Sequence, residues 1–440
     1  MKKLLIVAYY FPPSGGPGVQ RVLKHVKYLP EYGWQPVVLT VSNGQFPARD
    51  ESLLKEIPEG VIVERTHIYE PYDFYRLLTG RKKGEAIDVN VIKKENQKIS
   101  FKEKAAEFIR ATFFIPDARV GWLLSARKAV RELHEKYSFD AVYSSSPPYT
   151  CSLIGRYAGR KLKLPWVAGF RDPWTGFIST PKRWFLPAAI DRRMEYSVFS
   201  KADAVECAWE GIIKDALGKY PTLGAGKFRH VPNGFDSADF PEIERKRNGK
   251  FTLTYSGSLY GRRNPSSLFS AVELLIKRGE VNPAEIILRF VGRFGAEVEE
   301  MFRNASFSQS IETISYVPHK KSIEYLMTSD CLLLIVDESK ESQEIVPGKV
   351  YEYLGVNRPV MAIAPPQSAI AGLMEETSSG LVAHQSETEK IADIFLNYYN
   401  DWKNGTHSFN PDTAIVKSYE RREAAGKLAR LLDEIIENYK

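Results

Sequence analysis

Two glutamates, Glu344 and Glu352, lie eight positions apart, with Pro347, Gly348 and Lys349 between them. Proline and glycine here favour the start of a helix, whose free N–H groups suit a phosphate. Lys349 adds a positive charge. A carboxylate before this helix and another inside it can accept hydrogen bonds from hydroxyls on either side of a diphosphate. The spacing alone is a weak indication, because such pairs are common on helix surfaces by chance.

A glycine-rich loop, Pro12–Gly18, follows the apolar segment Lys3–Ala8. Gly15, Gly16 and Gly18 would let backbone N–H groups approach an anion at a helix start. An ordinary tight turn explains the loop about equally well. The loop is not G-x-G-x-x-G, and no acidic residue clearly ends the next strand, which argues against a nicotinamide cofactor.

These residues need elements to position them, and both halves of the chain alternate expected strands and helices. In the first half, strands are predicted at Lys3–Ala8, Pro36–Val41, Val61–Arg65, Ala141–Ser144, Trp166–Gly169 and Ala204–Cys207, and helices at Val19–Tyr32, Ala118–Tyr137 and Tyr149–Leu162. In the second half, strands are predicted at Phe251–Ser256, Glu285–Val291, Ile311–Val317, Cys331–Val336 and Val360–Ala364, and helices at Pro265–Arg278, Lys321–Met327, Lys349–Val356 and Ile415–Lys440. A linker, Asp236–Gly249, separates the halves. The pattern predicts two doubly wound parallel sheets with a cleft between them.

Composition bounds the function. With 440 residues, 43% hydrophobic and 26% charged, the chain is typical of a folded protein of two or three domains. No apolar run reaches the ~20 residues of a membrane span, so a cytoplasmic location is expected. The three cysteines and seven histidines show no metal-ligand spacing, so no metal is expected. The net charge of +7 is modest, and no basic run is dense enough for nucleic acid.

The segment from Tyr69 to Phe114 departs from this rhythm, because it combines many lysines with flanking aromatic clusters. We interpret it as a mobile insertion. In the favoured interpretation it is a solvated loop whose aromatics complete the core. In the other, it contacts an anionic membrane peripherally, with aromatics in the headgroup layer and lysines at the lipids.

At this point the chain resembles a known family. Glu344–Glu352, with the sequence that continues through Arg358-Pro359-Val360, resembles the E-x7-E element of family 4 glycosyltransferases, which have the GT-B fold. Further segments match in order along nearly the whole chain, and some are typical of members that build surface polysaccharides such as O-antigen. They are Phe114–Asp117 with Trp122, Ser144–Pro148, Phe170–Trp174, Val231–Asp236 and Tyr255–Leu259.

The resemblance implies a donor site for a UDP- or GDP-sugar, with no further cofactor. Glu344 would contact the sugar hydroxyls and Glu352 the ribose. Of the family's basic pair, one position is Ser258 here and the other is matched by Arg263, with Lys349 supplying part of the missing charge. No D-x-D motif occurs, so these groups would replace a metal ion. The full predicted donor set is Gly257, Ser258, Arg262, Arg263, Val317, Glu344, Val346, Pro347, Gly348, Lys349, Val350 and Glu352.

The resemblance further implies retention of the anomeric configuration. Asp172 is predicted to orient or deprotonate the acceptor hydroxyl, beside Arg171; the alternative is a structural Arg171–Asp172 ion pair behind Trp174. Predicted catalytic residues are thus Asp172, Arg263 and Glu344. His319 has a weaker claim to the nucleotide base, and His25 is expected at the surface.

The predicted architecture is α/β, with two Rossmann-like domains of the GT-B type. Residues 1–240 would bind a glycan or lipid-linked acceptor, residues 241–410 the donor, and the helix in 411–440 would return to the first domain. The predicted function is glycosyl transfer in cell-surface glycan synthesis. Alternatives are a nucleotide-sugar epimerase of similar fold, and a nonenzymatic nucleotide-sugar-binding protein.

Overall fold

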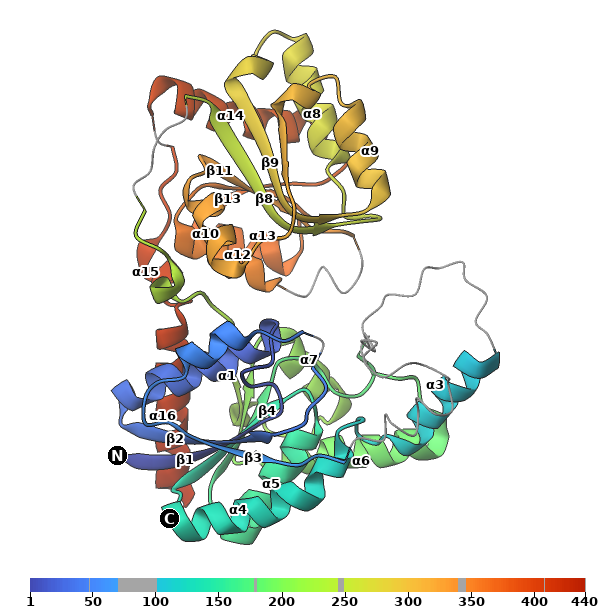
Figure 1. Ribbon diagram of the computed structural model, residues 1–440, viewed down its shortest axis with the longest axis vertical. Coiled ribbons are helices and arrows are strands. Elements are labelled where there is room, and N and C mark those ends of the chain that lie inside the picture. Colours follow the sequence, from blue (N-terminus) through green and yellow to red (C-terminus); the bar gives the residue numbers. More distant parts are fainter. Residues whose placement is uncertain are drawn as a thin grey trace. The chain divides into compact units, whose positions relative to one another are not determined.

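The computed structural model describes residues 1–46, 48–69, 101–177, 180–243, 249–338, 346–406 and 408–439, without the side chains of residues 17 and 101–106. The chain divides into two compact units. Unit 1 comprises Met1–Asn233 and Ala424–Lys440, and unit 2 comprises Gly234–Glu423. Each unit contains its own sheet flanked by helices (Figure 1).

Unit 1 contains a parallel sheet in the order β3-β2-β1-β4-β5-β6-β7. In chain order these strands are β1 (Lys2–Ala8), β2 (Trp34–Val41), β3 (Ile62–Thr66), β4 (Ala141–Ser146), β5 (Trp166–Phe170), β6 (Ala204–Cys207) and β7 (Phe228–His230). The order reverses between β1 and β4, and ligands of doubly wound sheets bind outside the carboxyl ends of the strands at such a reversal.

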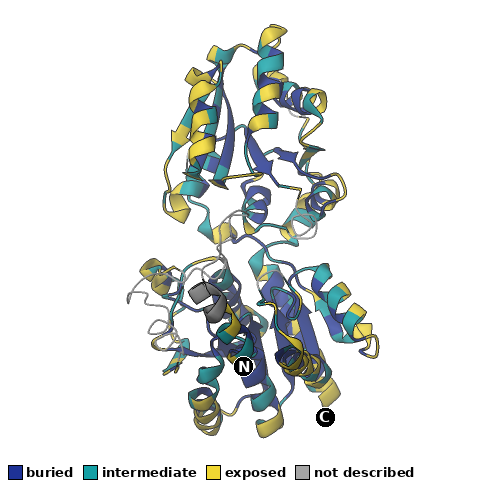
Figure 2. Ribbon diagram, turned by 90° about the vertical axis from the view of Figure 1, so that its right-hand side faces the viewer, coloured by how far each residue is buried: buried dark blue, intermediate teal, exposed yellow. Residues whose placement is uncertain are grey.

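Helices cover both faces of this sheet. They include α1 (Pro17–Tyr28), α3 (Phe101–Phe113), α4 (Leu123–Tyr137), α5 (Thr150–Leu162), α6 (Phe185–Lys201), α7 (Glu210–Lys219) and α16 (Arg421–Tyr439). Because side chains alternate along a strand, Leu4 and Ile6 of β1 pack with α1 and α16, whereas Leu5 and Val7 pack on the face covered by α4 and α5. The strands are therefore buried from both sides (Figure 2).

Unit 2 contains a second parallel sheet in the order β10-β9-β8-β11-β12-β13, with its reversal between β8 and β11. Its strands are β8 (Phe251–Leu259), β9 (Ile286–Phe294), β10 (Ile311–Ile314), β11 (Cys331–Ile335), β12 (Val360–Ile363) and β13 (Gly380–Ala383). Its helices include α8 (Ser266–Lys277), α9 (Ala296–Asn304), α10 (His319–Met327), α12 (Gly348–Val356), α13 (Ala369–Thr377), α14 (Thr388–Asn404) and α15 (Thr413–Lys417). Helices α8, α9 and α14 cover one face, and α10, α12 and α13 cover the other.

The two parallel sheets confirm the predicted α/β class with Rossmann-like units. The predicted return of the C-terminal helix is also confirmed, since Leu428 and Leu432 of α16 belong to the core around Leu4 and Ile6. In addition, Lys2 Nζ lies 2.6 Å from Asp433 Oδ1 of this helix.

The prediction of one unbroken helix over Ile415–Lys440 is wrong. The helix is interrupted between Lys417 and Arg421, where Phe235 pairs with the chain. The Phe235 N–H donates to the Tyr419 carbonyl at 3.2 Å, and the Arg421 N–H donates to the Phe235 carbonyl at 2.8 Å. These bonds replace helical ones, so the interruption comes from a distant segment.

Two expectations about burial also need correction. His25 is buried rather than at the surface, with its ring edge-on to Tyr143. In the segment Tyr69–Phe114, residues 70–100 lie outside the described residues. Of the aromatics that are described, Phe114 is buried, whereas Tyr69, Phe108 and Phe113 are exposed. Among the described aromatics of this segment, the interpretation that they complete the core is therefore right only for Phe114.

Candidate active site

In unit 2, the parallel strands β8 and β9 approach each other closely at two glycines near their carboxyl ends. Gly257 has φ +131° and Gly292 has φ +148°, and the two are register partners. A Cβ on Gly292 would lie 1.9 Å from the Gly257 carbonyl oxygen. Only glycine fits at position 292, and the positive φ of Gly257 likewise favours glycine there.

Helix α12 brings Lys349 to the end of β8. Lys349 Nζ lies 3.8 Å from the centroid of the Tyr255 ring and donates to the Ser256 carbonyl at 3.3 Å. A Cβ on Gly257 would be 3.5 Å from the same Nζ. The helix is held in place by Tyr353, whose hydroxyl donates to the Leu333 carbonyl at 3.2 Å and accepts from the Ser256 N–H at 3.0 Å.

Arg263 reaches the same strand ends from the loop that follows β8. Its Nη2 lies 3.1 Å from Asp337 Oδ2, and Asp337 follows β11, the neighbour of β8 across the reversal. Its Nε is buried and has no hydrogen-bond partner among the described residues. An unsatisfied buried donor costs free energy, so an acceptor arriving at this point would be stabilised.

Lys349 and Arg263 are neighbouring basic groups, and their positive charges repel each other when no anion is bound. Burial, and next the positive charge of Arg263, hold the pKa of Lys349 well below its ordinary value, while Glu352 partly offsets them. A bound diphosphate would raise the pKa of Lys349 again, because its negative charge attracts both Lys349 and Arg263. The arrangement can thus stabilise a phosphate leaving group electrostatically.

Glu352 lies one turn further along α12. Its Oε1 is 2.8 Å from Nε2 of His319, the first residue of α10. Helix α10 is tied to β8 by the contact between the Ser256 and Ser322 hydroxyls at 2.7 Å. The Glu352 carboxylate is only partly exposed, and a ribose would exchange its His319 partner for hydroxyl donors.

The other residues of the predicted donor set lie around these strand ends or outside the described residues. The Ser258 side chain and Arg262 are exposed, and Val317 is half-buried ahead of α10. Residues Val346, Pro347 and Gly348 lead into α12, and no side chain caps the start of this helix. Val350 is fully buried in the core, so it can offer a ligand no side chain. Glu344 lies outside the described residues.

In unit 1, the glycine-rich loop opens α1 at the end of β1. Gly16, with φ +94°, precedes the helix, whose start has no side-chain cap and no acidic residue. Gly15 N–H donates to the Ala48 carbonyl at 2.9 Å. A Cβ on Gly18 would lie 3.7 Å from Arg171 Nη2. The structure therefore brings the predicted loop and Arg171 together.

Arg171 and Asp172 follow β5. The Arg171 guanidinium donates to the Ser145 hydroxyl and the Pro147 carbonyl at the end of β4. The side chain of Asp172 makes no hydrogen bond or ion pair with the part of the chain that the structure describes, so the alternative of an Arg171–Asp172 ion pair is wrong. Burial raises the pKa of Asp172, and the Arg171 charge partly offsets this rise. A half-buried carboxylate without a partner suits a general base.

Sequence reasoning missed a buried ion pair behind the glycine-rich loop. Arg21 Nη2 of α1 lies 2.6 Å from Glu206 Oε1 of β6 and 2.7 Å from the Val231 carbonyl. Its Nη1 is 3.1 Å from Asn233 Oδ1. Burial alone would raise the pKa of Glu206, but Arg21, with His25 and Tyr143, lowers it to about 2.

Asp337 was also missed. Its signal was a carboxylate directly after a predicted strand, at the edge where ligands bind.

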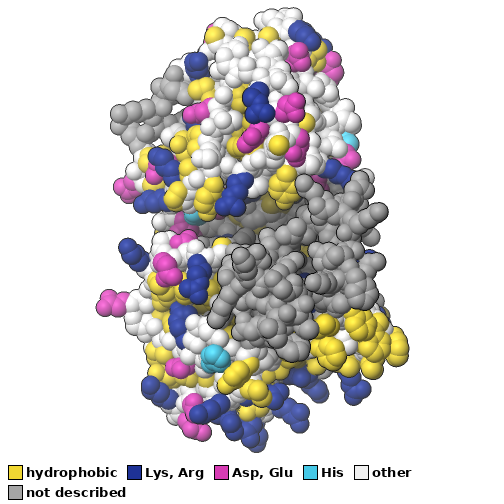
Figure 3. Space-filling model, turned by 45° about the vertical axis from the view of Figure 1, so that its right-hand side comes forward, with side chains coloured by type: hydrophobic (Ala, Val, Ile, Leu, Met, Phe, Trp, Pro, Cys, Tyr) yellow, Lys and Arg dark blue, Asp and Glu magenta, His cyan; other side chains and the backbone are white. Residues whose placement is uncertain are grey.

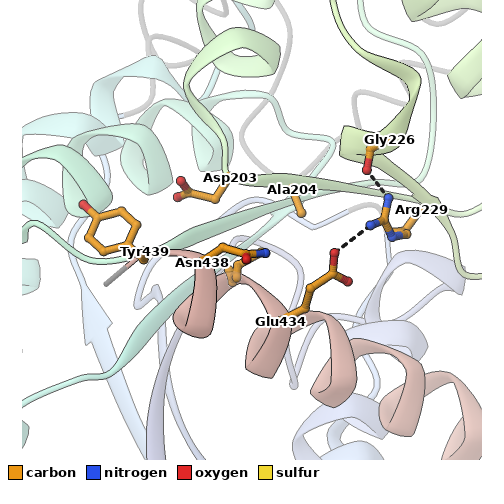
Figure 4. Close-up of a pocket in the computed structure, with 8 residues that line it drawn as sticks. Asp203, Ala204, Gly226, Arg229, Glu434, Asn438 and Tyr439 are labelled. Carbon is orange, nitrogen blue, oxygen red and sulfur yellow. Dashed lines mark hydrogen bonds and ion pairs between the residues drawn. The ribbon is translucent and has the colours of Figure 1, made fainter.

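Two cavities lie away from these strand ends. One, of about 250 Å³, is at the amino ends of β6 and β7 beside α16, where Arg229 pairs with Glu434 and also donates to the Gly226 carbonyl (Figure 4). The other, of about 120 Å³, lies in unit 2 beside Trp402. None of the predicted site residues lines either cavity.

Among the described residues, no group of three or more His, Cys, Asp or Glu side chains could hold a metal ion.

No protein-family model matches the chain, and no curated protein matches its sequence. Solved structures, in contrast, match over almost its full length.

A glycosyltransferase from Rickettsia africae is 13% identical with a TM-score of 0.61, covering 99% of each chain. A lipopolysaccharide outer core galactosyltransferase is 12% identical with a TM-score of 0.54, covering 98% of this chain and 99% of its own. A putative UDP-N-acetylglucosamine 2-epimerase from Listeria monocytogenes is 12% identical with a TM-score of 0.55, covering 100% of this chain and 98% of its own. Together with the two parallel sheets, these matches show the GT-B fold.

Proposed function

We propose that the protein is a retaining glycosyltransferase of the family 4 type. It transfers a sugar from a nucleoside diphosphate sugar, with UDP or GDP as the leaving group, to a lipid-linked or polysaccharide acceptor. We place it in the cytoplasm, in cell-surface glycan synthesis, and propose that it needs no metal.

The observation that carries this proposal is the pair of cations at the end of β8. Arg263 has a buried Nε without an acceptor among the described residues, and burial, followed by the charge of Arg263, lowers the pKa of Lys349. Groups that raise each other's free energy in the unliganded protein are stabilised by a dianionic ligand. A departing diphosphate supplies that charge during bond cleavage, so the interaction strengthens in the transition state.

Glu352 and Asp172 complete the proposed chemistry. Glu352 would accept hydrogen bonds from the ribose in place of His319. The acceptor hydroxyl would lose its proton to Asp172 and attack the face of the sugar that the diphosphate leaves, so that the configuration is retained without an enzyme nucleophile. Two of the similar structures are named as glycosyltransferases, which agrees with transfer, whereas the epimerase is the named alternative.

The first experiment is a thermal-shift titration of the full chain with UDP, GDP, ADP and the corresponding sugars, with EDTA throughout. A ligand that binds only the folded state raises the melting temperature by mass action. We expect one diphosphate to give this shift in the wild type and Glu352→Ala to abolish it. His319→Ala, which leaves the Glu352 carboxylate in place, should weaken the shift less than Glu352→Ala does.

Turnover is then measured with the stabilising nucleotide sugar. Slow release of free sugar without an acceptor supports transfer, whereas an epimerised nucleotide sugar supports the epimerase. Binding with neither product supports a nonenzymatic protein. No shift from any diphosphate, with the wild type folded, overturns the proposal.

A further inference from the structure

Helix α6 of unit 1 is turned so that its acids face inward and its bases face outward. Both of its acidic residues, Asp191 and Glu195, are buried, whereas Arg192 and Arg193 are exposed. Its exposed face also carries large apolar side chains: Phe185 (81% exposed), Leu186 (50%) and Ile190 (40%). A helix that merely covers a core has the opposite pattern, with its polar side chains in solvent.

This orientation is fixed by hydrogen bonds. Asp191 accepts from Trp174 Nε1 at 2.8 Å and from Arg183 Nε at 2.9 Å. Glu195 accepts from the Thr175 N–H at 3.0 Å and from the Tyr220 hydroxyl at 2.8 Å. Rotating α6 to hide its apolar face would break all four bonds and expose the core. The apolar face is therefore held outward.

Helix α3 extends the same apolar surface. Trp184 Nε1, next to the start of α6, donates to Thr112 Oγ1 of α3 at 3.0 Å, and Arg183 Nη1 donates to the Ala111 carbonyl at 2.6 Å. Phe108 and Phe113 of α3 are 57% and 69% exposed. We call the following six residues the α3–α6 surface: Phe108, Phe113, Trp184, Phe185, Leu186 and Ile190. In Figure 3, hydrophobic side chains gather in this part of unit 1, with Lys and Arg side chains beside them.

The charge around this surface is positive. Lys182, Arg192 and Arg193 are exposed, and no exposed acid lies on α6. Arg156 of α5 contacts the Ser197 hydroxyl of α6. Burial lowers the pKa of Arg156, and the charges of Arg127 and Arg160 lower it further. Glu107 is the exposed acid on the described side chains of α3.

We propose that the α3–α6 surface docks on an anionic membrane. The aromatic and aliphatic side chains enter the headgroup layer, and the surrounding bases contact lipid phosphates. A second copy of the chain fits poorly, because pairing this surface with itself would bring arginines against arginines. The inference stands on the surface alone and does not depend on the transferase chemistry.

This location differs from the sequence-based expectation, which placed membrane contact within Tyr69–Phe114. Only the α3 part of the surface falls there, and the arginines and most of the exposed apolar side chains come from α6 and the residues before it. No described helix is long and apolar enough to cross a membrane.

The test is co-sedimentation of the full chain with vesicles of phosphatidylcholine alone or of phosphatidylcholine and phosphatidylglycerol in equal parts. We expect the wild type to bind the anionic vesicles, and more weakly at high salt. Phe185→Ser/Leu186→Ser and Arg192→Glu/Arg193→Glu should each lower partitioning on the order of tenfold or more. Matched controls are Leu54→Ser for lost apolar exposure and Lys277→Glu/Arg303→Glu for the charge change; both should bind like the wild type.

Circular dichroism checks folding, and an unchanged nucleotide thermal shift in each variant separates this test from that of the donor site. Absence of wild-type binding to anionic vesicles overturns the proposal, as does undiminished binding by both surface variants. Concentration-dependent dimerisation that the surface variants abolish, without vesicle binding, would assign the surface to a second copy instead.

Discussion

Lys349 of α12 lies with its Nζ 3.8 Å from the centroid of the Tyr255 ring of β8. The contact stabilises a cation, yet burial and Arg263 disfavour the same charge. A lysine under these opposing influences responds strongly to an arriving anion, because its proton affinity rises when negative charge is placed beside it. Ligand binding and protonation at this strand end are therefore expected to be linked.

Replacing Lys349 with methionine separates stability from binding. We expect the affinity for the nucleoside diphosphate to fall tenfold or more, since a charge-assisted contact is lost. In the wild type the folded pKa is below the unfolded one, so the unfolded state binds more protons between these values and stability rises with pH there. Lys349→Met should lack this rise. Calorimetric titration and melting at several pH values measure both effects, with Lys277→Met as the exposed control. Unchanged affinity would remove Lys349 from the donor site.

Asp172→Asn tests the acceptor side. We expect a fall in kcat of roughly a hundredfold or more, because the amide cannot take the proton, with donor affinity little changed. Burial raises the pKa of Asp172, so the acidic limb of the wild-type pH–rate profile should lie above the ordinary carboxyl range. Steady-state kinetics with nucleotide titration distinguish the two effects. A loss confined to KM would make Asp172 a binding group rather than a base.

The close approach of β8 and β9 at Gly257 and Gly292 leads to a prediction about stability. Gly292→Ala places a Cβ 1.9 Å from the Gly257 carbonyl, at φ +148°, so we expect a cost of a few kcal/mol. Gly372 is an exposed helical glycine whose Cβ would meet nothing within 4 Å. Gly372→Ala should stabilise unit 2 by about 0.5–1 kcal/mol. Hydrogen exchange of peptides from β8 and β9 measures both changes in stability. Equal protection of these peptides in Gly292→Ala and Gly372→Ala would contradict the close approach of the two strands at Gly292.

Acid should weaken unit 1 through Glu206. Its folded pKa of about 2 is below the unfolded value of ~4.3. The contribution of Glu206 to the free energy of unfolding is therefore present above the unfolded pKa and is lost as pH falls towards 2. Glu206→Gln leaves Arg21 buried without its counter-charge and should cost about 3–5 kcal/mol at neutral pH. The difference in the free energy of unfolding between Glu206→Gln and the wild type should become smaller below about pH 4.5.

Denaturation of this variant is followed by tryptophan fluorescence, because six of the seven tryptophans lie in unit 1. If the difference in the free energy of unfolding between the variant and the wild type stays constant from neutral to acid pH, protonation of Glu206 does not cause the loss of stability in acid.

Apolar runs between turn residues predicted the central strands of both sheets well. The β6 bounds, Ala204–Cys207, agree in full, and β4 and β8 differ only by extra residues at the carboxyl end. That end is where the glycines and polar side chains of the candidate site begin, so the hydrophobic signal stops before the strand does.

Helix α6 was not predicted, and its surface explains why. The helical signal in a sequence is the contrast between an apolar face and a polar face. In α6 the buried face holds Asp191 and Glu195, while the exposed face holds Phe185 and Leu186, so the contrast disappears. Likewise, no spacing rule pairs Arg263 with Asp337, because that contact depends on β8 and β11 being neighbours in the sheet.

The composition of unit 1 from two distant stretches of sequence has a consequence for biosynthesis. A ribosome releases Met1–Asn233 first, but the face of β1 that carries Leu4 and Ile6 needs α16 to cover it. Unit 2, contained in Gly234–Glu423, emerges in full before Ala424–Lys440, which contains most of α16. The stretch made first must therefore wait with an open apolar face while the later unit completes itself, a period in which chaperones would bind it most readily.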